Sequence, residues 1–310
     1  APAERLHPIE RFNLVNDAWA LTQAGMLSPE AYLDLTDRFR DETDRHVWAP
    51  LLASFAALDR LAPAAVRGAL AALVRGRLQD AVARVGWAPA PDEPELSRQL
   101  RGELLRAAGT LGEDPAVQAA ARDLAGRGEG ADPNVLSAAI GILAHVGGPA
   151  EFETFLARFR RAATPQEEQR YLYALAAFRD PDLIQRVLDF SLDGTVRTQD
   201  APYLLRSLLL GPESREAAWT FLQARWDDMA GRYPENGLRR MWEGIVGLAT
   251  PALEAEVRAF VEARRISLGG KALAQYLEQL RIAVRFAERL AAPLARYLRQ
   301  EARAAAPPAG

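Results

Sequence analysis

Apolar positions recur every three or four residues along most of the chain, which is the spacing of one face of an α-helix. The stretch ERFNLVNDAWALTQAG near the start is an example. At 100° per residue, Phe12, Val15 and Trp19 fall on one side of a helix with Leu14 and Leu21 beside them. Alternating runs that would indicate strands are scarce, whereas Ala, Leu, Arg and Glu dominate. All four residue types favour helix, so the pattern predicts an all-α fold.

Five residue pairs have the form that begins a helix, a capping residue or glycine followed by proline. They are Asp114-Pro115, Asp132-Pro133, Gly148-Pro149, Thr164-Pro165 and Asp180-Pro181. Successive prolines are 18, 16, 16 and 16 residues apart. This spacing leaves room for helices of about 12 to 14 residues joined by short turns. Two such helices form a hairpin of about 32 to 36 residues, which is typical of helical-repeat proteins.

The expected architecture is a curved stack of antiparallel helix hairpins, a HEAT-like α-superhelix of roughly 16 helices in a single domain over residues 1–310. Three segments interrupt the pattern. Residues 87–97 form a Pro-rich break, and residues 193–202 form a loop. Residues 299–310 form a tail of small residues that we expect to be frayed. None of the three has the composition of an interdomain linker.

Composition and charge narrow the classes of function. The chain is 49% apolar and 25% charged, with a net charge of −3. This near balance argues against a nucleic-acid binder. No run of about 18 apolar residues occurs, so we expect no membrane span. The absence of cysteine excludes disulfides, thiolate-bound metal and cysteine catalysis, and it is compatible with the cytoplasmic location that we expect.

Motifs of intrinsic catalysis are missing. His7, His46 and His145 are not spaced to share one helix face, and no His-Glu-x-x-His pair occurs. There is no Gly-x-Ser-x-Gly elbow and no glycine-rich phosphate loop. We therefore expect this chain to carry no catalytic residue, no metal and no cofactor.

Short segments along nearly the whole chain occur in an order and spacing that belong to one enzyme family. Residues 10–48 contain an Arg, an Asn-Asp pair, an Ala-Gly turn, a Tyr-Leu-x-Leu helix, a Glu-Thr pair and a Val-Trp pair. Leu-Arg-x-x-Leu-Leu follows at 100–105, Arg-x-Gln-Asp at 197–200 and Ala-Trp-x-Phe-Leu at 218–222. Together they resemble the C-terminal helical domain of zinc aminopeptidases of the aminopeptidase N type, which includes the puromycin-sensitive and endoplasmic-reticulum aminopeptidases.

The resemblance implies a non-catalytic C-terminal domain of a zinc metallo-aminopeptidase. Such a domain covers the active-site cavity and helps to bind or select peptide substrates. Its partners would be the peptide and the catalytic domain of the same parent polypeptide, which holds the zinc. The family's Gly-Ala-Met-Glu-Asn and His-Glu-x-x-His motifs belong to that catalytic domain and do not occur here, so we expect this chain to be inactive alone.

Two alternatives to this function remain open. A stand-alone helical-repeat scaffold would bind another protein on its concave face. An independent hydrolase would cleave aminoacyl reporter substrates by itself, and for that activity we expect a negative result.

Arg11 is a candidate for a structural ion pair, because its side chain projects into the apolar arc of its own helix. A buried cation requires a partner. We expect a carboxylate on a neighbouring helix, Glu42 or Asp44, to supply it. The alternatives are that Arg11 extends outward into solvent or contacts substrate directly.

Four residues are candidates for peptide contact. Arg197, Gln199 and Asp200 lie in the loop that interrupts the helical rhythm, and loops on rigid scaffolds often carry function. Arg239 carries a guanidinium whose geometry suits a peptide carboxylate. The competing role for all four is loop capping and pairing between helices.

Overall fold

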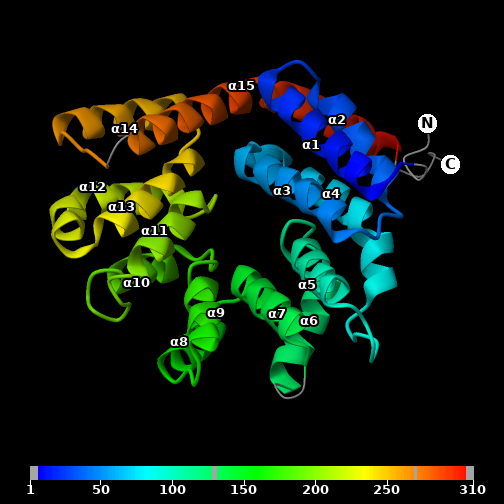
Figure 1. Cartoon of the computed structure of the whole chain (residues 1–310), viewed down its shortest axis with the longest axis horizontal. Helices are drawn as coiled ribbons and strands as arrows, with labels where there is room; N and C mark the ends of the chain where they lie inside the picture. The colour runs from blue at the N-terminus through cyan, green and yellow to red at the C-terminus, as the bar shows by residue number, and fades with distance from the viewer. Residues whose placement is uncertain (1–5, 128–130, 269–270, 305–310) are drawn as a thin grey trace. The chain divides into compact units, whose positions relative to one another are not determined.

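The computed structural model describes residues 6–127, 131–268 and 271–304, and its regular secondary structure in these ranges is entirely helical (Figure 1). This confirms the all-α prediction. The described ranges hold fifteen α-helices, against the roughly 16 expected for the stack. The helices are α1 (Pro8–Ala24), α2 (Pro29–Thr36), α3 (Arg45–Leu61), α4 (Ala64–Val85), α5 (Glu95–Thr110), α6 (Pro115–Arg127), α7 (Pro133–Val146), α8 (Pro149–Arg160), α9 (Pro165–Leu175), α10 (Pro181–Phe190), α11 (Ala201–Leu210), α12 (Arg215–Arg232), α13 (Glu235–Trp242), α14 (Pro251–Ala263) and α15 (Ala272–Ala304), with 3-10 segments η2 (Asp37–Phe39) and η3 (Glu243–Gly247).

The five proline pairs begin α6 to α10 as predicted. Asp180, for example, accepts hydrogen bonds from the backbone N–H groups of Asp182 and Leu183 at 2.9 and 3.2 Å. Gly148 has no side chain to offer, and there the Glu151 carboxylate accepts from the Gly148 N–H at 3.0 Å instead. The regular rhythm is confined to this part of the chain, because α12 has 18 residues and α15 has 33.

The predicted irregular segments correspond to two long connections and the chain end. Residues 86–94 connect α4 to α5, and residues 191–200 connect α10 to α11. Residues 299–304 of the expected tail continue α15, and residues 305–310 lie outside the described residues.

The chain divides into two compact units. Unit 1 spans Ala1–Leu143 and Glu288–Gly310, and unit 2 spans Ala144–Ala287. The boundaries therefore fall inside α7 and α15.

Unit 1 is a set of helices in which neighbours along the chain pack on one another. α1 contacts α2 and α3, α3 contacts α4 and α5, and α5 contacts α6. Its core contains Trp48, Phe55 and Tyr32, and each of these side chains is almost fully buried. The Tyr32 hydroxyl donates to the Oγ of Ser54 at 2.6 Å, so the polar end of this buried ring is satisfied.

Helix α1 buries a narrower stripe than its pattern suggested. Val15, Ala18 and Thr22 are buried, whereas Leu14 and Leu21 are 39% and 41% exposed. The Thr22 hydroxyl donates to the Ala18 carbonyl at 2.8 Å, which lets a polar residue occupy the buried stripe. Leu14 and Leu21 stay exposed because α2 and α3, which make the main contacts with α1, do not cover them.

The last part of α15 is tied to the start of unit 1 by polar contacts. The Tyr297 hydroxyl donates to Oδ1 of Asp34 at 2.9 Å. An ion pair joins Arg296 to Glu30 at 3.0 Å. The end of α15 accordingly lies beside α1 and α2 in Figure 1, although these segments are far apart in sequence.

Unit 2 is organised around α11, which contacts α9, α10, α12, α13 and η3. Gly247 allows the contact with η3, because a Cβ there would lie 2.1 Å from the carbonyl oxygen of Leu209. Trp219 and Trp242 of this unit are almost fully buried and lie edge to face with ring centroids 6.4 Å apart. Such an arrangement is favourable for aromatic pairs.

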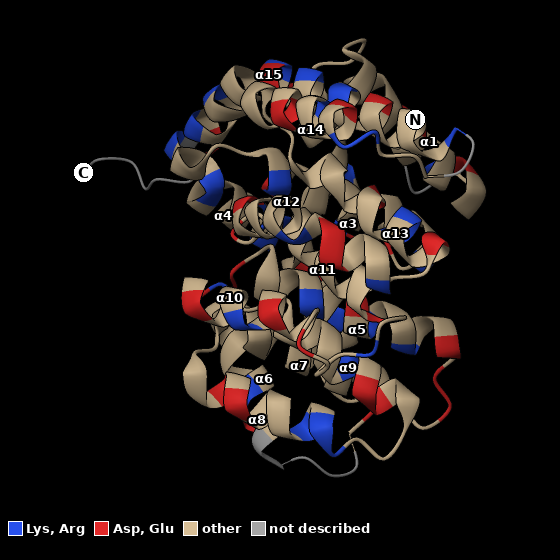
Figure 2. Ribbon diagram, turned by 90° about the vertical axis from the view of Figure 1, so that its left-hand side faces the viewer, with Lys and Arg blue, Asp and Glu red and all other residues tan. Residues whose placement is uncertain are grey.

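Charged residues of both signs are interspersed along the helices (Figure 2). No helix in the described ranges contains a stretch that is long and apolar enough to cross a membrane.

Candidate functional site

A pocket of about 380 Å³ in unit 2 brings together two of the four residues predicted to contact peptide. Gln199 and Asp200 contribute from the loop before α11. The other lining residues come from α9, α11 and the start of α13: Gln169, Tyr173, Tyr203, Pro234, Asn236 and Gly237.

The loop that carries Gln199 and Asp200 is held in place by the body of unit 2. The Tyr233 hydroxyl, at the end of α12, donates to the Ser191 carbonyl at 2.7 Å. Val196 is buried, and its N–H donates to the Phe190 carbonyl at 3.2 Å. These contacts make the loop a defined wall of the pocket.

Close packing of α13 on α11 sets the opposite wall. A Cβ on Gly237 would lie 3.0 Å from Cγ of Pro202, so only glycine permits this approach without a shift. The first turns of the two helices meet there. Asn236 and Tyr203 consequently line the same pocket.

Arg197 does not line the pocket, but it binds Asp200, which does. Its Nε donates to Oδ2 of Asp200 at 2.8 Å, and its Nη2 donates to the Glu168 carboxylate at 3.0 Å. Two carboxylates thus share one guanidinium, which leaves the group with a formal surplus of one negative charge. The side chain of Asp200 is only 13% exposed.

A second polar group in unit 2, formed by Glu243, Arg206 and Arg240, carries a formal surplus of one positive charge. Glu243 pairs with Arg206 at 3.0 Å and with Arg240 at 2.6 Å, and it also accepts from the Tyr276 hydroxyl at 3.4 Å. The hydrogen bond and charge of Glu243 raise the pKa of the Arg240 guanidinium, and the phenol of Tyr203 adds to this effect. Arg206 and Arg240 lie on α11 and α13, the helices that also carry Tyr203 and Asn236 of the pocket lining.

The phenol of Tyr173, which lines the pocket, is partly removed from water. Burial raises the pKa of the Tyr173 phenol, and the negative charge of Asp200 raises this pKa further. The positive charge of Arg206 acts in the opposite direction. The charges of both polar groups are consequently felt inside the pocket.

The predicted residue Arg239 is placed differently. It lies on α13 and faces Glu235 one turn away at 3.6 Å, with its side chain 44% exposed. It is not among the residues that line the pocket.

Tyr173, Asn236 and Gln169 were missed from sequence because they stand on helices that no motif marks. Only the folded structure distinguishes the tyrosines, because it leaves the large aromatic residues Tyr173 and Tyr203 37% and 38% exposed.

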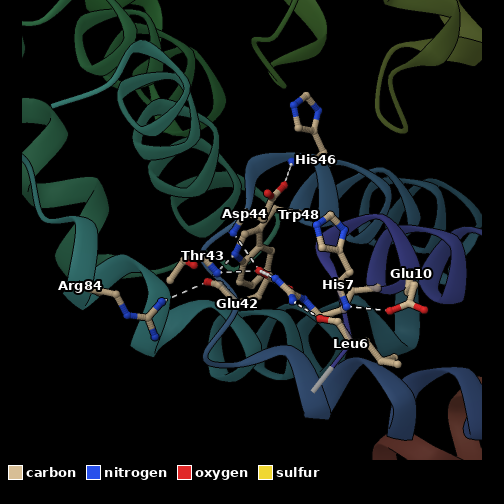
Figure 3. Close-up of polar contacts among 10 residues, drawn as sticks. Leu6, His7, Glu10, Glu42, Thr43, Asp44, His46, Trp48 and Arg84 are labelled. Carbon is tan, nitrogen blue, oxygen red and sulfur yellow. Dashed lines mark hydrogen bonds and ion pairs between the residues drawn. The ribbon is translucent and has the colours of Figure 1, made fainter. Parts of the chain in front are cut away.

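Arg11 and Glu42 form the second predicted arrangement, in unit 1. Figure 3 shows the polar contacts around Glu42. Arg11 donates from Nε to Oε2 of Glu42 at 2.6 Å and from Nη2 to Oε1 at 2.9 Å. Its Nη1 donates to the Leu6 carbonyl at 2.7 Å. The side chains are 15% and 2% exposed, respectively. The hydrogen bond to Glu42 raises the pKa of the Arg11 guanidinium against the effect of burial.

Asp44, the other carboxylate considered for Arg11, has a different role. It caps α3 by accepting from the His46 N–H at 2.8 Å. Its own N–H donates to Oε1 of Glu42 at 2.8 Å, as does the N–H of Thr43 at 2.9 Å. The Arg11–Glu42 pair therefore pins the start of α1 to the turn before α3, a structural role.

The described residues contain no group of three His, Asp or Glu side chains placed to hold a metal ion. His7, His46 and His145 stand at the starts or ends of different helices and form no such group.

Comparisons with known proteins identify the family of this chain. Residues 1–282 match the family model described as ERAP1-like C-terminal domain. Aminopeptidase M1-A of Oryza sativa subsp. japonica is 28% identical over 298 residues, covering 92% of this chain. Aminopeptidase M1 of Arabidopsis thaliana is 29% identical over 299 residues, and the alanine/arginine aminopeptidase of Saccharomyces cerevisiae is 26% identical over 305 residues.

These matches span only 34% to 35% of the relatives' own length, while covering 92% to 94% of this chain. The similarity thus concerns one portion of each aminopeptidase. The chain belongs to the family of ERAP1-like C-terminal domains, the C-terminal helical domain of aminopeptidases of this type.

Proposed function

We propose that this chain is the non-catalytic C-terminal domain of a zinc metallo-aminopeptidase and that it helps to bind peptide substrates. The observation that carries the proposal is the match of almost the whole chain to about a third of several aminopeptidases. The zinc and the reacting groups would reside in the remaining part of the parent polypeptide. The described residues of this chain do not fit a zinc ion, since none of them forms a metal-holding group.

The pocket in unit 2 supports a role in peptide binding. Its carboxamides and tyrosine hydroxyls both donate and accept hydrogen bonds, which is what a peptide backbone requires. Contacts with parts of a substrate far from the reacting bond supply binding energy that positions the reacting end. Gln199 and Asp200 would make such contacts directly, with Arg197 supporting them from behind.

The arginines of α13 would meet the acidic end of the peptide. A guanidinium pairs well with a carboxylate. Arg240 belongs to the group around Glu243, which carries a surplus positive charge, and Arg239 is accessible on the same helix. The domain would also cover the active-site cavity of the parent enzyme and so exclude water and folded proteins from it.

The test combines this chain with the separately produced remainder of its parent polypeptide. Hydrolysis of a long peptide and of a single-residue aminoacyl reporter is measured with and without the chain. We expect the chain to accelerate cleavage of the long peptide more than that of the reporter, and to show no activity by itself. Equal rates with and without the chain for both substrates would contradict the proposal.

A pair of variants makes the test specific for the pocket. Gln169→Ala removes a lining carboxamide, and Gln185→Ala removes an exposed carboxamide from α10 outside the pocket. We expect the first to raise KM for the long peptide several-fold, by about the free energy of one hydrogen bond, and the second to leave KM unchanged. The reporter, which is too short to reach the pocket, serves as the internal control.

A further inference from the structure

The lining of the pocket in unit 2 has one formal charge, the carboxylate of Asp200. The other polar groups of the lining are three carboxamides, on Gln169, Gln199 and Asn236, and two tyrosine hydroxyls. Neutral groups of this kind solvate either sign of charge. The carboxylate therefore decides which charge the pocket prefers.

Asp200 is not neutralised by its own surroundings. Arg197 divides its single positive charge between Asp200 and Glu168. Only Oδ2 of Asp200 takes part in this pairing, and Oδ1 has no hydrogen-bond partner among the described residues. This oxygen belongs to a residue of the pocket lining and has no donor from the described part of the chain, so it is available to a donor that a ligand brings.

We infer that this pocket takes the basic side chain of a bound peptide, an arginine or a lysine. This inference rests on the proposed function, because it names the kind of peptide that the site selects. Oδ1 of Asp200 accepts from the guanidinium or ammonium, and carbonyl oxygens of the lining amides accept the remaining donors. Tyr173 and Tyr203 also line the pocket, and aromatic rings attract a cation.

The size and surroundings of the pocket agree with such an occupant. Its volume of about 380 Å³ lies at the lower end for ligand pockets and suits one long side chain with its adjoining backbone. The positive surplus around Glu243 lies outside the lining, on arginines that are paired with that carboxylate. An acidic group of the peptide would be attracted there and away from Asp200.

The experiment measures binding of fluorescently labelled, long alanine-based peptides to the chain by anisotropy. The peptides differ at one position, scanned along the chain, which holds arginine, lysine, glutamate or citrulline, the neutral isostere of arginine. We expect arginine and lysine to bind about tenfold tighter than citrulline at the preferred position, as for one charge-assisted hydrogen bond. Glutamate is expected to bind weakest.

Two variants with the same change in net charge locate the effect. Asp200→Asn is expected to abolish the preference for arginine over citrulline. Asp182→Asn, on the exposed first turn of α10, is expected to retain it. Circular dichroism establishes whether each variant is folded. If Asp200→Asn is not folded, the preference measured with the unmodified chain decides the matter.

The outcomes separate the inference from the proposed function. Peptides that all bind with equal affinity would overturn the inference and leave peptide binding by the domain in place. A basic preference that survives in folded Asp200→Asn would also overturn it. No binding of any peptide, either to the chain or to the chain combined with its parent's remainder, would contradict the proposed function as well.

Discussion

Arg11 and Glu42 face each other across two hydrogen bonds, of 2.6 and 2.9 Å, although they are 31 residues apart. Both oxygens of the Glu42 carboxylate are occupied, since Oε1 also accepts backbone N–H groups of the turn before α3. A single side chain thus holds together the first helix and the turn that starts the third.

Removing this carboxylate leaves the Arg11 guanidinium without its counter-ion. Because Glu42 is 2% and Arg11 15% exposed, we expect Glu42→Gln to reduce the free energy of unfolding by about 3 kcal/mol. The measurement is urea unfolding followed by circular dichroism. The control is Glu153→Gln, which breaks an exposed pair with Arg186 and is expected to cost less than about 1 kcal/mol. Equal losses in the two variants would show that the buried pair is worth no more than a surface pair.

Gly247 provides a test of the packing around α11. A methyl group there would lie 2.1 Å from the Leu209 carbonyl oxygen, so α11 and η3 must move apart in Gly247→Ala. We expect a loss of roughly 2 kcal/mol or more in unfolding free energy. Gly231→Ala is the matched control, because a methyl group on α12 at that position meets nothing within 4 Å. That variant should be neutral or more stable by up to about 1 kcal/mol. A Gly247→Ala protein as stable as the control would contradict the close contact.

The buried phenol of Tyr32 gives unit 1 a dependence on alkaline pH. Burial raises the pKa of Tyr32 above its ordinary value of 10.0. Between these two pKa values the unfolded chain releases the proton and the folded chain keeps it. The stability that Tyr32 contributes is therefore complete below pH 10 and falls as the pH rises further, by about 1.4 kcal/mol per pH unit.

The measurement compares urea midpoints at pH 8 and pH 11 for the unmodified chain and Tyr32→Phe. The phenylalanine variant loses the hydrogen bond to Ser54 at either pH, so the readout is the change between the two conditions. We expect this change to be smaller in the variant. Identical pH dependence in both proteins would mean that Tyr32 is not the group responsible.

The cap of α10 yields a local prediction. Asp180 accepts two backbone hydrogen bonds at the start of that helix, at 2.9 and 3.2 Å. Asp180→Ala should cost about 1 kcal/mol, and hydrogen exchange in the first turn of α10 should accelerate correspondingly. Asp182→Ala removes a charge from the same turn without removing the cap. Its expected cost is a few tenths of a kcal/mol, so similar exchange in the two variants would argue against capping by Asp180.

Local sequence determined where the helices begin and that the fold is all-α. A carboxylate or hydroxyl before a proline satisfies the first free N–H groups within a few residues, and this requires no knowledge of the rest of the chain. For that reason α6 to α10 start where the proline pairs predicted. The loop before α11 was likewise visible as an interruption of the rhythm.

Tertiary structure alone decided which faces are buried and which distant residues share a site. Leu14 and Leu21 belong to the apolar pattern of α1 yet remain exposed, because burial depends on where neighbouring helices lie. Arg239 stood beside Gln199 and Asp200 as a candidate but faces Glu235, whereas Tyr173, from another helix, completes the pocket. Helical periodicity fixes directions around one axis, and the distances between axes come from the packing of side chains such as Pro202 against Gly237.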